Sequence, residues 1–486
     1  MTGAALAVAS TIVGFDPTRR SWIDEAQAAA CPSFTRVPPL DGKLVMDSTT
    51  LAGNAHDEGN MLWRTPCAVL YPASVDDISK MIRYCGRFGI GVSPNTGKNS
   101  VFGQTLVDGG LMINMRSLAT IHSITSTHAD VDGGVLWMDL IKAAFAQGVT
   151  PASITGYTQL GVAGTLSIGG LNAMTSNRDV WQVNHVAALQ AVTGNGDIVR
   201  CSAGENTDLF NALRAGLGQC GVITRATVEM VPAKTMARLY RVPYADIATF
   251  FSDVRTLAAR GGRQGGFDWV ASVNSTGPVA PIALWAAALF DPSAPPPPTA
   301  TLMQGCSALA QGGQFVDMPY LDYVFLVDTA VNALRTSANW DRLIKPWINV
   351  VLPDSGAQAF VESVVPALGP QDLSATTFLV IVPVKSGTIA PLLRVPPSTG
   401  WHWVFGLLTN STLPGPDPSY SASMLARNYR LWQSAVAIGG TRYLEDAVPF
   451  SKADWQMHYG AVYEQFAAWK RQFDPHYLLG RGASVF

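Results

Sequence analysis

The stretch that decides the fold is GVSPNTGKNSVFGQ, residues 91–104, which follows a segment of helical periodicity and precedes a strand. Its small residues let backbone N–H groups turn inward and approach an anion closely. We interpret the stretch as the loop that holds the pyrophosphate of a flavin dinucleotide. An ordinary turn rich in Gly, Asn and Ser is the alternative, which the stretch alone leaves open.

Two other parts of the chain favour the flavin interpretation. One is a second Gly-rich stretch, GVAGTLSIGG at residues 161–170, and the other is the C-terminal tail. Before the first stretch, Ser74 is expected to cap a helix that ends near Gly89, and after the second stretch Asn195-Gly196 is expected to turn a β-hairpin. The patterns predict strands at 67–71, 90–93, 111–115, 129–133, 186–192, 197–201 and 221–228, and further helices at 135–147 and 209–215.

Composition excludes several classes of protein. The 486 residues are 48% hydrophobic and 14% charged, which allows large cores, and the net charge of −2 offers no basic surface for nucleic acid. No apolar run reaches the roughly 20 residues of a membrane span. The six cysteines are scattered without zinc spacing, so we expect neither a structural metal nor a disulfide framework.

The N-terminus allows two interpretations. Residues 2–13 are small and apolar, and the alanines at 28–30 resemble a signal-peptidase site, but no basic region precedes the apolar run. The segment is either a truncated export signal or a part of the chain packed on the body. We expect an exported protein in the first case and a cytoplasmic one in the second.

After Pro232 the chain predicts a second region, a sheet with covering helices. Helices are expected at 246–260 and 424–436, and strands at 267–273, 282–289, 347–352, 377–384 and 401–408. The tail is expected to be helical from residue 455 to residue 473 and to continue as a loop. No internal repeat is present.

Further motifs follow in order: GTLS at 164–167, VTG at 192–194, GLGQCGVITRA at 216–226, YLDY at 320–323, PWIN at 346–349, Tyr443-Leu444, ADW at 453–455, HYG at 458–460 and FDP at 473–475. Together with the two Gly-rich stretches, they resemble the flavoprotein superfamily of vanillyl-alcohol oxidase and p-cresol methylhydroxylase (PCMH). The chain is most similar to the cytokinin dehydrogenase branch, from about residue 63 to residue 486.

The resemblance implies an α+β fold with a PCMH-type FAD-binding domain. That domain is expected at residues 63–232, preceded by an N-terminal segment at 1–62 that joins it and completed by the C-terminal tail at 437–486. A substrate domain, built on an antiparallel sheet with covering helices, is expected as an insertion at 233–436.

The resemblance also implies which residues contact FAD. Ser100, Gln104, Ser167 and Leu171 are expected to touch the cofactor, and Val222 or Ile223 to do so through the backbone. Gly161 and Gly480 occupy contact positions where only the backbone contributes. The expected cofactor-binding set is Pro94, Asn95, Thr96, Gly97, Lys98, Asn99, Ser100, Gln104, Gly161, Gly164, Ser167, Leu171, Val222, Ile223 and Tyr443.

Two departures from the family pattern concern the chemistry. The histidine that bonds covalently to the flavin falls at Asn99, and the cysteine that makes a second flavin bond in a related branch falls near Tyr157, so we expect noncovalent FAD. The aspartate that accepts a proton from the substrate in cytokinin dehydrogenases falls at Gly156, and a glycine cannot act as a general base. A cytokinin substrate is therefore not expected.

Our candidate catalytic residues are Tyr157, Tyr443 and Arg481. Tyr157 lies beside Gly156 and either orients or deprotonates the substrate, or stacks within the flavin domain. Tyr443 is expected near the isoalloxazine ring. Arg481 either places positive charge near the flavin pyrimidine or pairs with Asp474.

Other candidate site residues also allow two interpretations. Glu445 and Asp446 either supply the missing carboxylate or form a solvated pair in a loop. Lys98 either binds phosphate or lies on the surface. On the strand at 401–403 the two tryptophans share a face opposite the histidine, and we expect them in the core. His458 is expected to be structural.

The resemblance implies an FAD-dependent oxidoreductase, an oxidase or dehydrogenase that transfers hydride from a small-molecule alcohol, phenol or amine to flavin N5. Oxygen or a quinone-like carrier is the expected electron acceptor, and secondary metabolism the expected setting. The alternative is a flavin-retaining protein that catalyses a non-redox cyclisation or isomerisation, or only binds a ligand, because the family's base is absent. A scaffold without flavin is a third reading.

Overall fold

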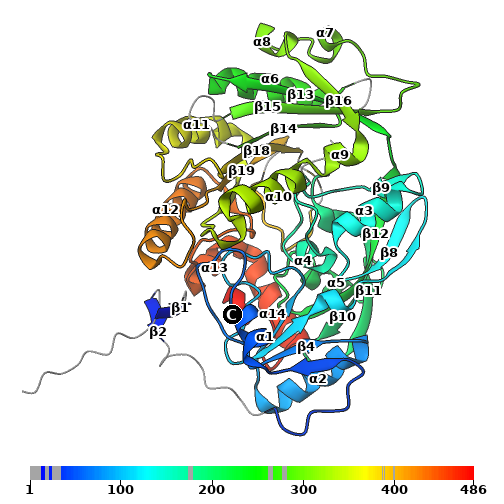
Figure 1. Ribbon diagram of the computed structural model, residues 1–486, viewed down its shortest axis with the longest axis vertical. Coiled ribbons are helices and arrows are strands. Elements are labelled where there is room, and N and C mark those ends of the chain that lie inside the picture. The colour runs from blue at the N-terminus through cyan, green and yellow to red at the C-terminus, as the bar shows by residue number, and fades with distance from the viewer. Residues whose placement is uncertain are drawn as a thin grey trace, which may run out of the picture.

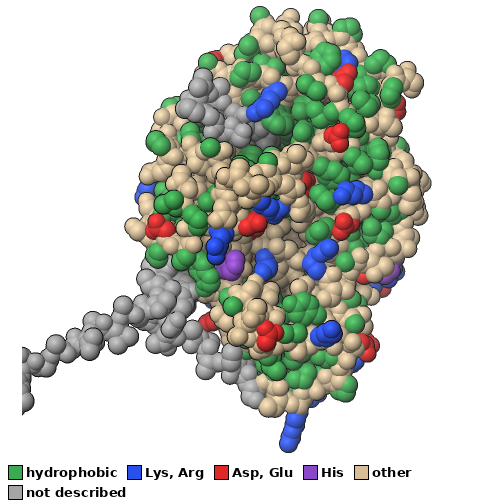
Figure 2. All heavy atoms as spheres, viewed as in Figure 1, with side chains coloured by type: hydrophobic (Ala, Val, Ile, Leu, Met, Phe, Trp, Pro, Cys, Tyr) green, Lys and Arg blue, Asp and Glu red, His purple; other side chains and the backbone are tan. Residues whose placement is uncertain are grey.

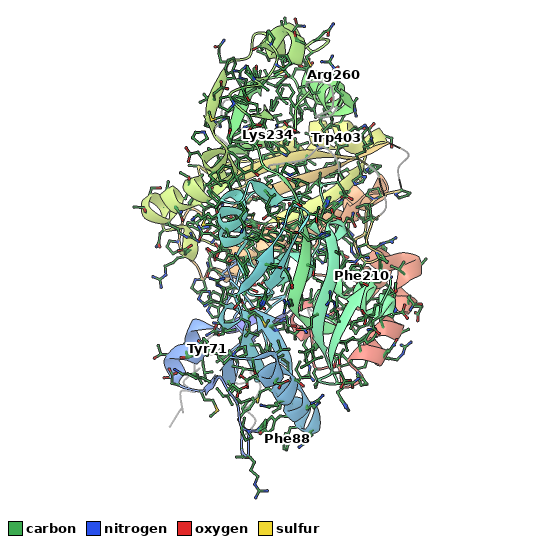
Figure 3. All side chains as sticks on the ribbon, turned by 90° about the vertical axis from the view of Figure 1, so that its right-hand side faces the viewer. Tyr71, Phe88, Phe210, Lys234, Arg260 and Trp403 are labelled. Carbon is green, nitrogen blue, oxygen red and sulfur yellow. The ribbon has the colours of Figure 1, made fainter. Side chains whose placement is uncertain are left out.

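The computed structural model describes residues 12–16, 21–24, 34–172, 179–260, 266–275, 282–385, 387, 389–397 and 400–486. Helices and sheets are mixed, as expected. An eight-stranded sheet with its helices forms the upper half of the elongated molecule, and two smaller sheets form the lower half and the right-hand side (Figure 1). In the side view, Tyr71 and Phe88 mark the lower part, Phe210 the middle, and Trp403 and Arg260 the upper part (Figure 3).

The four-stranded sheet carries the first Gly-rich stretch. Its strand order is β3-β4-β6-β5, with β4, β6 and β5 parallel. The preceding helix α2 (Val75–Phe88) packs an apolar face on this sheet and ends at Gly89, which adopts a left-handed conformation, as predicted. The strands are β3 (Lys43–Val45), β4 (Ala68–Tyr71), β5 (Val92–Asn95) and β6 (Leu111–Asn114), and α1 (Ser48–Gly53) lies between β3 and β4.

Two polar side chains fix the start of α2. Ser74 is its N-cap and accepts a hydrogen bond from the backbone N of Asp77 at 3.3 Å. The Asp77 carboxylate is fully buried and accepts from the backbone N of Asp41, Gly42 and Ala73. These bonds hold the segment before β3 against the helix. Burial alone would raise the pKa of Asp77, but together these hydrogen bonds outweigh burial and lower the pKa.

The second Gly-rich stretch lies beside the six-stranded sheet. The order of this sheet is β11-β10-β12-β8-β7, and β9 pairs with the far end of β12. The hairpin predicted around Asn195-Gly196 is the pair β10 and β11. The strands are β7 (Ile121–Ile124), β8 (His128–Asp132), β9 (Val149–Pro151), β10 (Val186–Thr193), β11 (Ile198–Ser202) and β12 (Gly221–Pro232), and the helices are α3 (Trp137–Phe145), α4 (Val162–Leu166) and α5 (Thr207–Leu213).

The eight-stranded sheet is antiparallel, in the order β16-β13-β15-β14-β18-β19-β17-β20. Its strands are β13 (Met236–Tyr244), β14 (Trp269–Ser275), β15 (Ile282–Phe290), β16 (Phe315–Pro319), β17 (Ile348–Pro353), β18 (Phe378–Lys385), β19 (Trp401–Leu408) and β20 (Thr441–Arg442). Its helices are α6 (Ile247–Arg260), α7 (Thr299–Leu302), α8 (Ala308–Gln311), α9 (Tyr320–Val324), α10 (Leu326–Ala338), α11 (Asp354–Val364) and α12 (Pro418–Ala437). This is the antiparallel sheet with covering helices that the sequence predicts for the second region.

The C-terminal tail returns to the N-terminal half. After α13 (Lys452–Tyr459) and α14 (Tyr463–Phe473), Val92 N donates to Leu478 O at 2.8 Å, and Arg64 reaches Gly482 O at 3.1 Å. Figure 1 accordingly shows the C terminus beside α1, although these segments are more than 400 residues apart in sequence. The tail thereby packs along the β5 edge of the sheet that carries the first Gly-rich stretch.

The expectation about cysteines needs one correction. Cys67 is disulfide-bonded, with its partner outside the described residues, whereas Cys85, Cys201, Cys220 and Cys306 are free and buried. Scattered spacing gave no sign of this bond because pairing depends on contacts between distant segments. The apolar run at 2–13 lies outside the described residues except for positions 12 and 13, which belong to β1 (Ile12–Asp16), paired with β2 (Ser21–Asp24), and the alanines at 28–30 also lie outside.

The surface agrees with the near-neutral composition. In Figure 2, basic, acidic and hydrophobic side chains are interspersed on the visible face, with no extended area of one charge. Within the part of the chain that the structure describes, none of the helices has the length and hydropathy needed to cross a bilayer.

Candidate functional site

The two Gly-rich stretches face each other across a cavity of about 1090 Å³, which we call the cradle cavity. Its walls also include the start of β12 and Gly480 of the tail. Most of the residues expected to bind the cofactor line it: Pro94, Asn95, Thr96, Gly97, Lys98, Asn99, Ser100, Gln104, Gly161, Gly164, Ser167, Val222 and Ile223. Residues scattered over the sequence therefore meet around a single space.

Glycines are required in the cradle wall for different reasons. A Cβ at Gly161 would lie 2.1 Å from Thr96 Cγ2, so only glycine lets the two stretches approach this closely. A Cβ at Gly480 would lie 2.3 Å from Gln219 Nε2, at a backbone φ of +66°. At Gly164 a Cβ would meet no atom within 4 Å and would instead enter the cavity.

A buried carboxylate that the sequence analysis missed holds the first stretch in place. Asp57 accepts hydrogen bonds from Ser100 Oγ at 2.9 Å, Gly103 N at 2.6 Å and Gly59 N at 3.2 Å. Burial raises the pKa of Asp57 to about 7, although these hydrogen bonds oppose the shift. Asp57 belongs to a polar loop without periodicity, so no pattern in the sequence singles it out.

Several polar side chains that line the cradle cavity form hydrogen bonds with other parts of the protein. Gln104 accepts from Phe102 N and donates to Asp446 O, both at 2.9 Å, which ties the first stretch to the tail. Lys98 is partly buried and lines the cradle cavity, and its Nζ donates to Gly53 O. Burial lowers the pKa of Lys98.

A second cavity of about 1270 Å³ adjoins the first, and we call it the aromatic cavity. The two cavities share Asn99, Leu160, Thr165, Ile168 and Glu445 as wall residues. The walls of the aromatic cavity come from both halves of the chain and include seven aromatic side chains: Tyr157, Trp269, Trp285, Trp340, Trp347, Phe378 and Tyr443. The tryptophans cannot be placed here from the sequence, because strand patterns show alternation but not which face lines a cavity.

Both candidate tyrosines line the aromatic cavity. Tyr443 is 2% exposed, and its OH accepts a hydrogen bond from Leu171 N at 3.2 Å. Both residues line the aromatic cavity and not the cradle cavity where the sequence placed them. Tyr157 OH accepts from Arg335 at 2.9 Å, beside Gly156 in the same wall. Burial raises the pKa of both phenols, so both stay protonated at neutral pH and are poor bases.

Among the residues that the structure describes, two carboxylates line the aromatic cavity. Glu58 accepts from Trp340 Nε1 at 3.0 Å and lies 3.4 Å from Lys345 Nζ. Glu445 lines both cavities, and burial together with its neighbour Asp446 raises the pKa of Glu445 to about 7. Asp446 lines neither cavity; it is fully buried in an ion pair with Arg442 at 2.6 Å. The interpretation of Glu445 and Asp446 as a solvated loop pair is therefore wrong.

The remaining candidates lie away from both cavities. Arg481 is exposed and donates to Tyr477 O and Gly89 O, and Asp474 pairs with Lys470, so neither expectation for Arg481 describes its position. Trp403 is buried in the core, as expected, and His458 is buried among aromatic rings. Burial lowers the pKa of His458 far below its usual range.

Comparison with known proteins agrees with this site. Residues 66–202 match the family model described as "FAD binding domain", and residues 299–486 match "Cytokinin dehydrogenase 1, FAD and cytokinin binding". FAD is therefore the cofactor that the chain binds.

Relatives cover nearly the whole chain. It is 31% identical to an uncharacterized oxidoreductase of the fasciation locus of Rhodococcoides fascians, over 90% of this chain and 97% of that protein. It is 32% identical to cytokinin dehydrogenase 1 of Oryza sativa subsp. japonica, over 94% of both chains. It is 28% identical to cytokinin dehydrogenase 2 of Arabidopsis thaliana, over 92% of this chain and 94% of that protein. The chain belongs to the cytokinin dehydrogenase family of FAD-dependent oxidoreductases.

Proposed function

We propose that this FAD-dependent oxidoreductase oxidises a small-molecule alcohol, phenol or amine held in the aromatic cavity, and that oxygen or a quinone-like carrier takes up the electrons. One observation carries the proposal: a largely apolar cavity opens directly onto the cradle cavity and shares wall residues with it. A substrate in one cavity and the cofactor in the other would meet at this shared wall.

The surface of the cradle cavity fits FAD. Its glycines expose backbone to the cavity and keep space free that side chains would fill. We propose that residues 63–232 and the tail at 437–486 hold FAD and that residues 233–436 hold the substrate. Asn99 has no ring nitrogen to bond to the flavin, which supports noncovalent binding.

FAD supplies a two-electron acceptor for hydride when bound. The protein's own part is to position the substrate and to exclude water. Tyr443 is held by Leu171 N and by the ring of Trp181 at 5.2 Å, so that its orientation is fixed. The tryptophans offer flat apolar surfaces to an aromatic substrate. Relatives are named cytokinin dehydrogenases, but Gly156 removes the base that cytokinin oxidation uses in the family.

Anaerobic addition of substrate tests the redox proposal. We would mix FAD-loaded protein with vanillyl alcohol, as an aromatic alcohol, and with N6-isopentenyladenine, as an aromatic secondary amine, and follow the visible flavin absorbance. The expected result is bleaching of the flavin by at least one probe, more strongly by the alcohol, with one oxidised product formed for each flavin reduced. A product of unchanged oxidation state from a flavin that stays yellow would contradict the proposal and support a cyclase or isomerase.

A further inference from the structure

We propose that the carboxylate of Glu445 accepts the proton that the substrate loses during oxidation, in place of the aspartate that is absent at Gly156. This inference rests on the proposed function, because it requires a substrate that loses hydride from carbon and a proton from nitrogen or oxygen. It assigns to a residue of the C-terminal tail a role that the family gives to a residue near the second Gly-rich stretch.

The position of Glu445 carries the inference. Glu445 and Asn99 are the polar side chains, besides the hydroxyl of Thr165, that line both cavities, and Glu445 alone among these three carries an ionisable group. Gly156 lines the aromatic cavity, so the vacated position and Glu445 face the same space. A base must reach the proton at the point where the substrate meets the cofactor. The shared wall is that point.

The backbone around Glu445 is fixed by the edge of the large sheet. The strand β20 ends at Arg442 and pairs with β17, which contains Asn349. Asn349 O accepts from Tyr443 N at 3.0 Å, and Asn349 Nδ2 donates to Glu445 O at 2.5 Å. Asp446 then turns away from the cavities to Arg442. These contacts hold Glu445 at the shared wall and distinguish it from its acidic neighbour.

The second carboxylate of the aromatic cavity is less suited to the role. Glu58 is engaged by the indole of Trp340 and by Lys345, and it does not line the cradle cavity. Among the described residues, Asp446 and Tyr443 are the titratable groups next to Glu445 on its own segment. Glu58 and Tyr157 lie in the wall of the aromatic cavity, and Lys98 lies in the wall of the cradle cavity. The two tyrosines stay neutral at ordinary pH.

The proposed step balances as follows. The substrate C–H bond breaks, and its hydrogen and electron pair pass to FAD as hydride. The N–H or O–H bond breaks, its proton passes to a Glu445 carboxylate oxygen, and its electron pair forms the C=N or C=O bond. The two electrons that the substrate loses would be taken up by the bound cofactor. Because only ionised Glu445 can accept a proton, the rate is expected to rise with pH through about 7, where its raised pKa lies.

The test compares E445Q with E445D and E58Q, each loaded with FAD and reduced anaerobically by vanillyl alcohol and by N6-isopentenyladenine between pH 5 and pH 9. E445Q is expected to slow flavin reduction by about 100-fold or more and to lose the rise with pH. E445D is expected to be slower than the wild type but to keep the rise. E58Q is expected to alter the probe concentration needed for half-maximal rate and to keep the rise. FAD content, measured for each variant, shows that the site is intact.

An infrared pH titration provides a readout that does not depend on turnover. Burial also raises the pKa of Asp57 and of Asp446 to about 7, so the readout is the difference between the wild type and E445Q. The wild-type holoprotein should show an additional C=O band of a protonated carboxyl group that disappears as the pH rises through about 7 and that E445Q lacks. An E445Q variant with wild-type rate and pH profile, or the same loss in E58Q, would overturn the assignment. So would wild-type and E445Q spectra that show the same carboxyl bands over this pH range. A wild type that neither probe reduces would instead contradict the proposed function.

Discussion

Replacing Gly164 by leucine is expected to leave the protein folded and to remove its FAD. Gly164 lies in α4, where leucine is a better helix former than glycine, and a Cβ at this position meets no protein atom within 4 Å. The leucine side chain would therefore extend into the cradle cavity without disturbing its walls. We expect FAD affinity to fall by at least about 100-fold, or about 2.8 kcal/mol at 1.4 kcal/mol per tenfold change.

The measurement is an FAD titration of the apoprotein, followed by flavin fluorescence, with thermal unfolding of the same samples. Gly204→Leu is the matched control, because a Cβ at Gly204 also meets no atom within 4 Å but Gly204 lines neither cavity. The control should bind FAD as the wild type does. Wild-type affinity in a folded Gly164→Leu variant would show that the cofactor lies elsewhere.

The second large effect is expected at the buried ion pair that fastens the tail. Lys470 Nζ donates to Asp474 Oδ2 at 2.7 Å and to the backbone oxygens of Gln219 and Leu479. Asp474 accepts in addition from Leu478 N and Leu479 N. Both side chains are at most 1% exposed. Asp474→Ala would leave the ammonium group buried without its partner, which typically destabilises a protein by about 3–5 kcal/mol.

Urea denaturation of the apoprotein gives this free energy of unfolding. Asp197→Ala is the control, because the Arg83–Asp197 pair is largely exposed and such pairs contribute about 0–1 kcal/mol. FAD binding should weaken in Asp474→Ala as well, because Gly480 of the tail lines the cradle cavity. Equal unfolding free energies for the two variants would show that the pair does not hold the tail in place.

Local signals in the sequence predicted much of the fold. Ser74 and Gly89 mark the ends of α2, and Asn195-Gly196 marks the β10–β11 hairpin, because caps and tight turns depend on neighbouring residues. The strand β13 and the helices α10 and α11 were not predicted. For α11 the signal is present, because Ala357, Phe360, Val361 and Val364 recur at helical spacing and are buried.

The candidate site, too, could be predicted from the sequence only in part. The residues of the two Gly-rich stretches follow motifs, and the structure brings them to one cavity. Asp57 and Glu58 reach the site only because the N-terminal loop folds against distant segments, which no local pattern records. Arg481 illustrates the opposite error, since its place in a motif of the tail suggested a contact that the fold does not make. Sequence reasoning also could not separate Glu445 from Asp446, because adjacent residues differ in direction only once the backbone is fixed.

The central claim is that the two Gly-rich stretches and the tail together bind FAD without a covalent bond. A visible spectrum of the purified protein before and after acid precipitation tests it most directly. We predict a yellow protein, a colourless pellet and FAD in the supernatant, because Asn99 stands where the family has its flavin-linking histidine. A yellow pellet would contradict noncovalent binding, and a colourless protein that takes up no FAD would contradict the whole account.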